Sequence, residues 1–130
     1  MQSDDRRRLD AFHQRCLRRI LSITYLDRIT NQEILFRTGQ RSMDAIIRER
    51  RMKWFGHVAR MNDNRLPKRI LNWNPPGKKR RGRPRLSWKE TMMKDLKALD
   101  LTWQEAQDEA QQRDVWRRTA ALCAPLHGKD

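Results

Sequence analysis

The chain has few cysteines and no long apolar segment. Its two cysteines, Cys16 and Cys123, lie far apart, so the sequence offers no disulfide framework and we expect reduced thiols in an intracellular protein. No apolar run approaches the roughly 20 residues that a membrane-spanning helix needs. The first eight residues are polar and lack the apolar core of a signal peptide. Together these absences predict that the protein does not enter a membrane.

Acidic residues are scarce in the first two thirds of the chain. Residues 1–85 carry 23 Lys and Arg against 8 Asp and Glu, a net of +15, whereas residues 86–130 carry 7 against 8, a net of −1. The whole chain has a net charge of +14 and a pI near 11.1. So basic a chain is expected to bind a polyanion, and nucleic acid is a better partner than an anionic membrane. We therefore expect the first two thirds to bind DNA or RNA, in the nucleus or in nucleus and cytoplasm.

The densest positive charge lies in residues 78–85, Lys-Lys-Arg-Arg-Gly-Arg-Pro-Arg, with six cations in eight positions. Proline fixes its own φ and biases the preceding arginine toward an extended backbone, while glycine removes a side chain from the path of a surface. An extended strip of this kind suits a narrow minor groove, where arginine is favoured. The candidate contacts here are Lys78, Lys79, Arg80, Arg81, Gly82, Arg83, Pro84 and Arg85.

Two other interpretations of this run need only its charge: a solvated linker and a nuclear-import signal. Residues 81–84 resemble an AT-hook, but the proline that usually precedes the first arginine is missing, which weakens the expectation of A·T selectivity. Groove binding and the two simpler interpretations therefore stay open at this point.

Helical spacing of apolar residues predicts an all-α fold, a small bundle of about five helices with an extended basic Arg-Gly-Arg-Pro loop. A first helix is expected over 5–23, a short second one from Thr30 to Gly39, and a third from Ser42 to Met61 with an apolar stripe at Met43, Ile46, Ile47, Trp54, Val58 and Met61. Asn62 to Pro76 is interpreted as a turn, a short segment and a linker. Capping boxes at Ser87 with Glu90 and Thr102 with Glu105 predict two last helices, the second running on to Pro125.

These elements suggest four regions: a basic helical region (1–73), a flexible basic AT-hook-like linker (74–86), a near-neutral helical hairpin (87–124) and a tail (125–130). Two basic helix faces in the first region are candidate phosphate contacts, although arginine-rich faces can also serve solubility alone. Their members are Arg15, Arg18 and Arg19 on the first helix and Arg50, Arg51 and Lys53 on the third.

The five tryptophans could either pack in the core or stack on unpaired bases. Trp54, Trp103 and Trp116 fall in register with other apolar residues and are assigned to packing. Trp73 and Trp88 flank the basic run and are candidates for stacking, with packing as the alternative.

Histidine and cysteine could form a zinc site, but the spacing does not favour it. The candidate ligands are His13, Cys16, His57, Cys123 and His127. The sequence has no Cys-x-x-Cys, and both cysteines fall on apolar stripes, so packing is preferred to metal binding and no cofactor is expected. No Ser-His-Asp or Cys-His arrangement is fixed by the sequence either.

Five segments in order resemble the region that follows the polymerase domain in animal non-LTR (LINE-type) retrotransposon reverse transcriptases. They are Arg-Leu-Asp-Ala-Phe-His-Gln-Arg-Cys-Leu-Arg-Arg-Ile-Leu (8–21), Asp-Arg-Ile-Thr-Asn (27–31), Lys-Trp-Phe-Gly-His-Val-Ala-Arg-Met (53–61), Arg-Leu-Pro-Lys-Arg-Ile-Leu (65–71) and Arg-Gly-Arg-Pro-Arg-Leu-Ser-Trp (81–88). The resemblance implies a nucleic-acid-handling appendage of an endonuclease and RNA-directed DNA polymerase.

The chain lacks the paired carboxylates by which a polymerase palm of that class holds two metal ions. Its single tyrosine, Tyr25, precedes Leu26 and Asp27, which is not a palm motif. We therefore expect binding without catalysis, and a possible partner in the remainder of a reverse transcriptase. The alternative is a protein-interaction remnant, in which the helices of 87–124 dock a partner and the basic run directs nuclear import. The sequence gives no signal for an oligomeric state.

Overall fold

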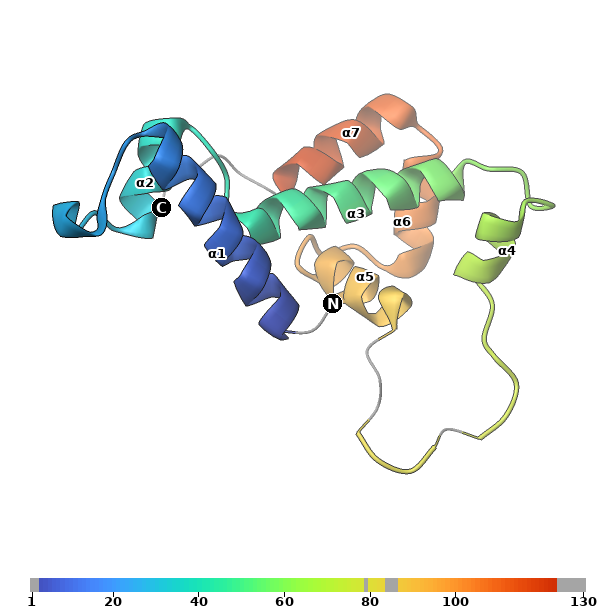
Figure 1. The fold of residues 1–130 in the computed structure, drawn as a ribbon. Coiled ribbons are helices and arrows are strands. Elements are labelled where there is room, and N and C mark those ends of the chain that lie inside the picture. The colour runs from blue at the N-terminus through green and yellow to red at the C-terminus, as the bar shows by residue number, and fades with distance from the viewer. Residues whose placement is uncertain (1–2, 79, 84–86, 124–130) are drawn as a thin grey trace. The chain divides into compact units, whose positions relative to one another are not determined.

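The computed structural model describes residues 3–78, 80–83 and 87–123. Within these ranges the chain forms seven α-helices, one 3₁₀ turn and no strand, which confirms the all-α prediction with more helices than the five expected (Figure 1). The elements are α1 (Ser3–Ile20), η1 (Tyr25–Asp27), α2 (Asn31–Thr38), α3 (Met43–Ala59), α4 (Leu66–Leu71), α5 (Trp88–Lys97), α6 (Trp103–Ala110) and α7 (Arg113–Leu122). No helix among the described residues is both long enough and apolar enough to cross a bilayer.

The described residues group into two compact units, 3–49 and 50–123, with the boundary inside α3. The first unit holds α1, η1, α2 and the start of α3. Its core is small: Leu17, Ile34 and Leu35 are buried, with Leu21, Ile23 and Ile29 packed against them. Local signals begin and end α2 as predicted, because the Thr30 hydroxyl accepts the Glu33 N–H at 3.2 Å and Gly39 takes a left-handed φ of 63°.

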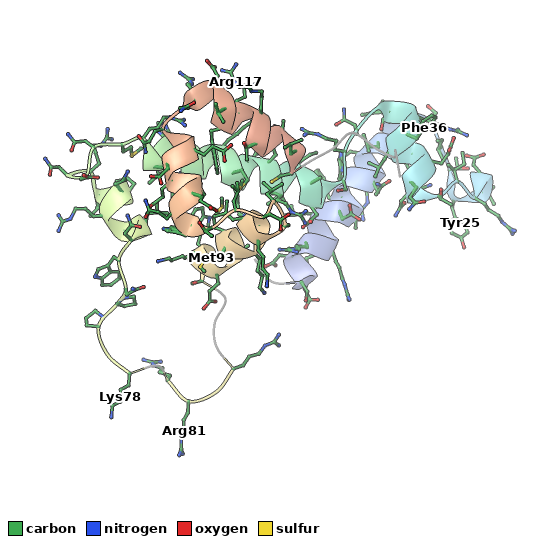
Figure 2. The ribbon with its side chains drawn as sticks, turned by 180° about the vertical axis from the view of Figure 1, so that it is seen from behind. Tyr25, Phe36, Lys78, Arg81, Met93 and Arg117 are labelled. Carbon is green, nitrogen blue, oxygen red and sulfur yellow. The ribbon has the colours of Figure 1, made fainter. Side chains whose placement is uncertain are left out.

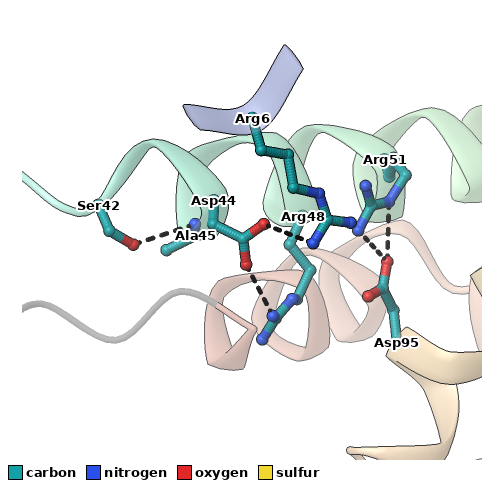
Figure 3. A network of polar contacts seen from close by, with 7 residues as sticks. All are labelled: Arg6, Ser42, Asp44, Ala45, Arg48, Arg51 and Asp95. Atoms are coloured by element: carbon teal, nitrogen blue, oxygen red, sulfur yellow. Dashed lines mark hydrogen bonds and ion pairs between the residues drawn. The ribbon is translucent and has the colours of Figure 1, made fainter. Parts of the chain in front are cut away.

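Ion pairs supplement this small core. Asp44, in the first turn of α3, accepts from Arg6 at 3.3 Å and from Arg48 at 2.9 Å (Figure 3). Glu49 pairs with Arg41. Several arginines of the first unit are therefore neutralised by acids of the same unit.

The second unit has a larger core, built from the end of α3 and from α4 to α7. Phe55, Met52, Met92 and Leu96 are almost completely buried there. Trp116 of α7 is also buried, and its indole N–H donates to the Met52 carbonyl at 2.7 Å. A Cβ added at Gly56 would lie 2.1 Å from Cδ1 of Trp116, so only glycine allows this indole to approach α3.

Trp103 and Trp116 pack on the core as predicted, but the prediction for Trp54 is wrong. Trp54 is 46% exposed, whereas Met52, Phe55, Val58 and Ala59 are buried. Val58 and Met61 of the predicted stripe do pack on the core. Met52 and Phe55 pack in place of Trp54, because both contact Trp116 of α7.

Two helix boundaries also differ from the sequence predictions. Residues 66–71 form a helix, α4, and Pro67 lies in its first turn, where a proline is tolerated because the missing N–H would have no partner in the helix. The last predicted helix is two helices, α6 and α7, separated by Gln112 with an extended ψ of 98°. Ala110 and Trp116 are both buried but are six positions apart, and in one continuous helix residues at this spacing would lie on different faces. The segment 87–123 is thus three helices instead of a hairpin.

Candidate nucleic-acid interface

Some of the cations are used to hold the fold together. In the second unit, Arg51 places Nε at 2.8 Å and Nη2 at 2.7 Å from Oδ2 of Asp95 on α5, and the two side chains are only 14% and 9% exposed (Figure 3). In the first unit, Arg18 donates to the Ile29 carbonyl at 2.7 Å and to Oδ1 of Asn31 at 2.9 Å. Arg18 and Arg51, both predicted to contact phosphate, therefore have partners within their own units.

Two further cations of the second unit cap helix C-termini. Arg60 donates to the Ala110 carbonyl at 2.8 Å, at the end of α6. Lys68 donates to the Ala59 carbonyl, at the end of α3. Burial lowers the pKa of Arg60, and the nearby charge of Arg113 lowers it further. Cations at helix C-termini are favourable because they satisfy carbonyls that have no partner in the helix.

The described cations of the loop between α4 and α5 have no such role. Lys78, Arg80, Arg81 and Arg83 are exposed, and none of them pairs with an acid in the part of the chain that the structure describes. Figure 2 shows Lys78 and Arg81 projecting away from the helices. Residues 64–89 contain ten Lys and Arg and no Asp or Glu, so the chain supplies no counter-charge nearby. Lys79, Pro84 and Arg85, also predicted contacts, lie outside the described residues.

The loop backbone bends at two glycines. Gly77 and Gly82 have φ values of 116° and 115°, which side-chain-bearing residues rarely adopt. The chain bends at 76–77 and again at 81–83. Space is not the reason for glycine here, since a Cβ at either position would meet nothing within 4 Å. Insertion of a straight Arg-Gly-Arg-Pro strip into a groove stays a prediction.

A second exposed set lies on α3. Arg50, Lys53, Trp54 and His57 are all exposed and, at helical spacing, share one face. Trp54 also contacts Trp88, the first residue of α5, with ring centroids 4.7 Å apart and ring planes at 75°. The structure thus joins the predicted residues Arg50, Lys53 and Trp88 with the basic loop in one unit.

Sequence reasoning missed Trp54 as part of this face. Helical spacing could have indicated this position. The buried residues Met52, Phe55 and Ala59 recur at steps of three and four, and Trp54 lies outside that row. Its neighbours at the same register are the cations Arg50 and Lys53.

The remaining predicted contacts belong to the first unit. Arg15 and Arg19 are exposed on α1 and have no acid partner among the described residues. Exposed apolar side chains of the same helix lie close to them in sequence, Phe12 at 61% and Ile20 at 75% exposure. Of the apolar side chains of α1, Leu17 is buried and Cys16 is half-buried, so the apolar spacing that predicted this helix is only partly used for packing.

The predicted preference for packing over metal binding concerns five residues, of which His127 lies outside the described range. Within residues 3–78, 80–83 and 87–123, no three His, Cys, Asp or Glu side chains come together as metal ligands. Cys123 is buried in the core of the second unit and Cys16 is half-buried.

Comparison of the chain with protein-family models, with curated proteins and with solved structures finds no match.

Proposed function

We propose that this protein binds nucleic acid by gripping the phosphate backbone of template RNA or target DNA. The observation that carries the proposal is the basic loop, defined here as residues 74–86, whose described cations Lys78, Arg80, Arg81 and Arg83 are exposed without acidic partners. Arginine and lysine on a protruding, acid-free segment can reach phosphates without first breaking internal ion pairs. Arg50 and Lys53 on α3 extend the same positive surface.

The resemblance to the post-polymerase region of LINE-type reverse transcriptases supports the same function. In such a polypeptide, the module would hold template RNA or target DNA beside the polymerase, and the remainder of the enzyme would be its partner. The basic loop would also suffice as a nuclear-import signal, which agrees with a nuclear site of action.

The experiment compares two triple variants that remove equal charge. Arg80, Arg81 and Arg83 are changed together to Gln in the basic loop, and Arg113, Arg117 and Arg118, all exposed on α7, are changed together to Gln as the control. Anisotropy titrations of labelled duplex DNA, single strands and structured RNA at low salt measure both. The loop variant should lose at least about tenfold in affinity and the α7 variant much less, because loss of net charge alone acts weakly. Equal losses from the two variants would contradict the assignment.

The alternative, docking of a protein partner by 87–124, has less support from the surface. Within 87–123 the exposed large apolar side chains are Trp88, Met93 and Leu122. Apolar residues scattered singly on a surface need no partner to explain them. Failure to bind any nucleic acid would favour this alternative.

A further inference from the structure

Building on the proposed function, we propose that Trp54 and Trp88 form a stacking platform for unpaired bases, so that the ligand of this interface is single-stranded nucleic acid. The platform is defined as these two indoles and the cations Arg50 and Lys53 beside them on α3. The basic loop would hold phosphates of the same strand.

The first argument is the contrast between these indoles and the aromatic residues in the core of the second unit. Phe55 and Trp116 are 0% and 2% exposed and contact each other with ring centroids 5.4 Å apart. Trp54 and Trp88 are also in contact, edge to face with ring centroids 4.7 Å apart, yet stay 46% and 37% exposed. The pair therefore presents ring surface to the solvent while each ring is held by the other.

The second argument is that the pair is held in place before any ligand binds. Ser87 caps α5 in a capping box: its hydroxyl accepts the Glu90 N–H, and the Glu90 carboxylate accepts the Ser87 N–H, each at 3.2 Å. This fixes Trp88 in the first turn of the helix. Trp54 is fixed by its neighbour Phe55, which is fully buried. Rigid aromatic side chains lose little conformational entropy on binding.

The third argument is the charge around the rings. Arg50 and Lys53 lie within about one turn of Trp54, and Trp88 is separated from the basic loop by Ser87 alone. The nearest acid in sequence to Trp88, Glu90, uses its carboxylate in the capping box. Cations beside stacking rings are the arrangement that binds single strands, because phosphates and bases are contacted together.

The unpaired state of the ligand follows from energetics. Stacking of a base on an aromatic side chain contributes about 1 to 3 kcal/mol. Taking a base out of a duplex costs a few kcal/mol, so the platform gains little from paired bases. An unpaired strand exposes its bases already and can use phosphate contacts and stacking at once.

The test uses the full chain with Trp54→Leu and Trp88→Leu, measured by anisotropy on 12-nucleotide oligo(dT), 12-nucleotide oligo(rU) and a 12-base-pair duplex. Each variant should lose about 5- to 150-fold in affinity for the single strands, as the loss of one stacked base predicts, and little for the duplex. Trp88→Phe should restore most of the loss, because phenylalanine retains a ring face. Whichever oligonucleotide binds wild type more tightly identifies DNA or RNA as the source of the strand.

Trp73→Leu is the matched control. Trp73 is 58% exposed near the start of the same loop, but no ring contact holds it among the described residues. The platform is refuted if Trp73→Leu loses as much affinity for single strands as the platform variants do. It is also refuted if Trp54→Leu and Trp88→Leu bind single strands as tightly as wild type. Neither result would contradict binding of the phosphate backbone by the basic loop. If wild type binds none of the three oligonucleotides, the proposed function fails as well.

Discussion

Trp116 rests directly on Gly56, and this contact sets the distance between α7 and α3. Because a Cβ at residue 56 would lie 2.1 Å from the indole, Gly56→Ala must displace Trp116 from its hydrogen bond to Met52. We expect the variant to lose about 1 to 3 kcal/mol of unfolding free energy, as overpacked cores do. Helix propensity alone predicts the opposite sign, a gain of about 1 kcal/mol. Urea denaturation decides between them, and an unchanged or raised midpoint would contradict the contact.

Individual arginines of this chain have two different uses: some form ion pairs within the fold, and others are exposed for binding phosphate under the proposed function. Arg51 is half-buried and pairs with the buried Asp95, whereas Arg80 is exposed on the basic loop. Arg51→Gln should therefore reduce stability by about 3 kcal/mol, because it removes the charged guanidinium that pairs with a buried carboxylate, with little effect on the salt dependence of nucleic-acid binding. Arg80→Gln should change that salt dependence and leave the melting temperature nearly unaltered. Denaturation and salt titration of both variants check this, and exchanged effects would refute the division.

These two uses could not be separated from the sequence. The partner of Arg51 lies 44 positions away and that of Arg18 lies 11 positions away, so no local pattern distinguishes them from Arg50 or Arg15. The cations of the basic loop, by contrast, were visible from composition, because no acid lies near them in sequence.

At the scale of single elements, helix starts are the best-predicted feature. Ser42, Ser87 and Thr102 begin α3, α5 and α6 as expected, since each hydroxyl accepts an N–H only three residues ahead. The buried stripe of α3 and the break between α6 and α7 depend on packing between distant segments, such as Met52 with Trp116. Periodicity within one segment does not determine those contacts.

The start of α6 should respond to acid. The backbone N–H of Thr102, 2.8 Å from Oε2 of Glu105, and the Thr102 hydroxyl lower the pKa of this carboxyl below its ordinary 4.5. A carboxyl with a lowered pKa in the folded state stabilises above its unfolded pKa, and this contribution disappears as pH falls through the folded value. Glu105→Gln keeps an oxygen acceptor but cannot titrate. Melting temperatures between pH 7 and pH 2.5 should therefore fall somewhat less for the variant than for wild type, and parallel curves would contradict the assignment.

At the scale of the whole molecule, the two units differ in how much they bury. The core of residues 3–49 contains three buried apolar residues, against twelve in residues 50–123. Small cores give low local stability. Hydrogen exchange should therefore show faster amide exchange in α1 and α2 than in α5 and α7. Equal protection in both units would mean that burial does not set local stability here.

The structure shows which of the many positive charges of the chain are used within the fold. Acids of the first unit pair with its arginines, and the second unit uses Arg51, Arg60 and Lys68 internally. Among the described residues of the second unit, Lys78, Arg80, Arg81 and Arg83 of the basic loop carry charge that pairs with no acid. The proposed function therefore depends on whether phosphates neutralise the loop.

The most direct measurement is the affinity of the wild-type chain for a labelled nucleic acid between 50 and 200 mM salt. If the loop occupies about five phosphates, a plot of log affinity against log salt should have a slope of about −4 to −5 on duplex DNA, and a shallower one on single strands. Changing Arg80, Arg81 and Arg83 to Gln should reduce the duplex slope by about 3. A slope near zero, or one that the triple variant leaves unchanged, would contradict the account.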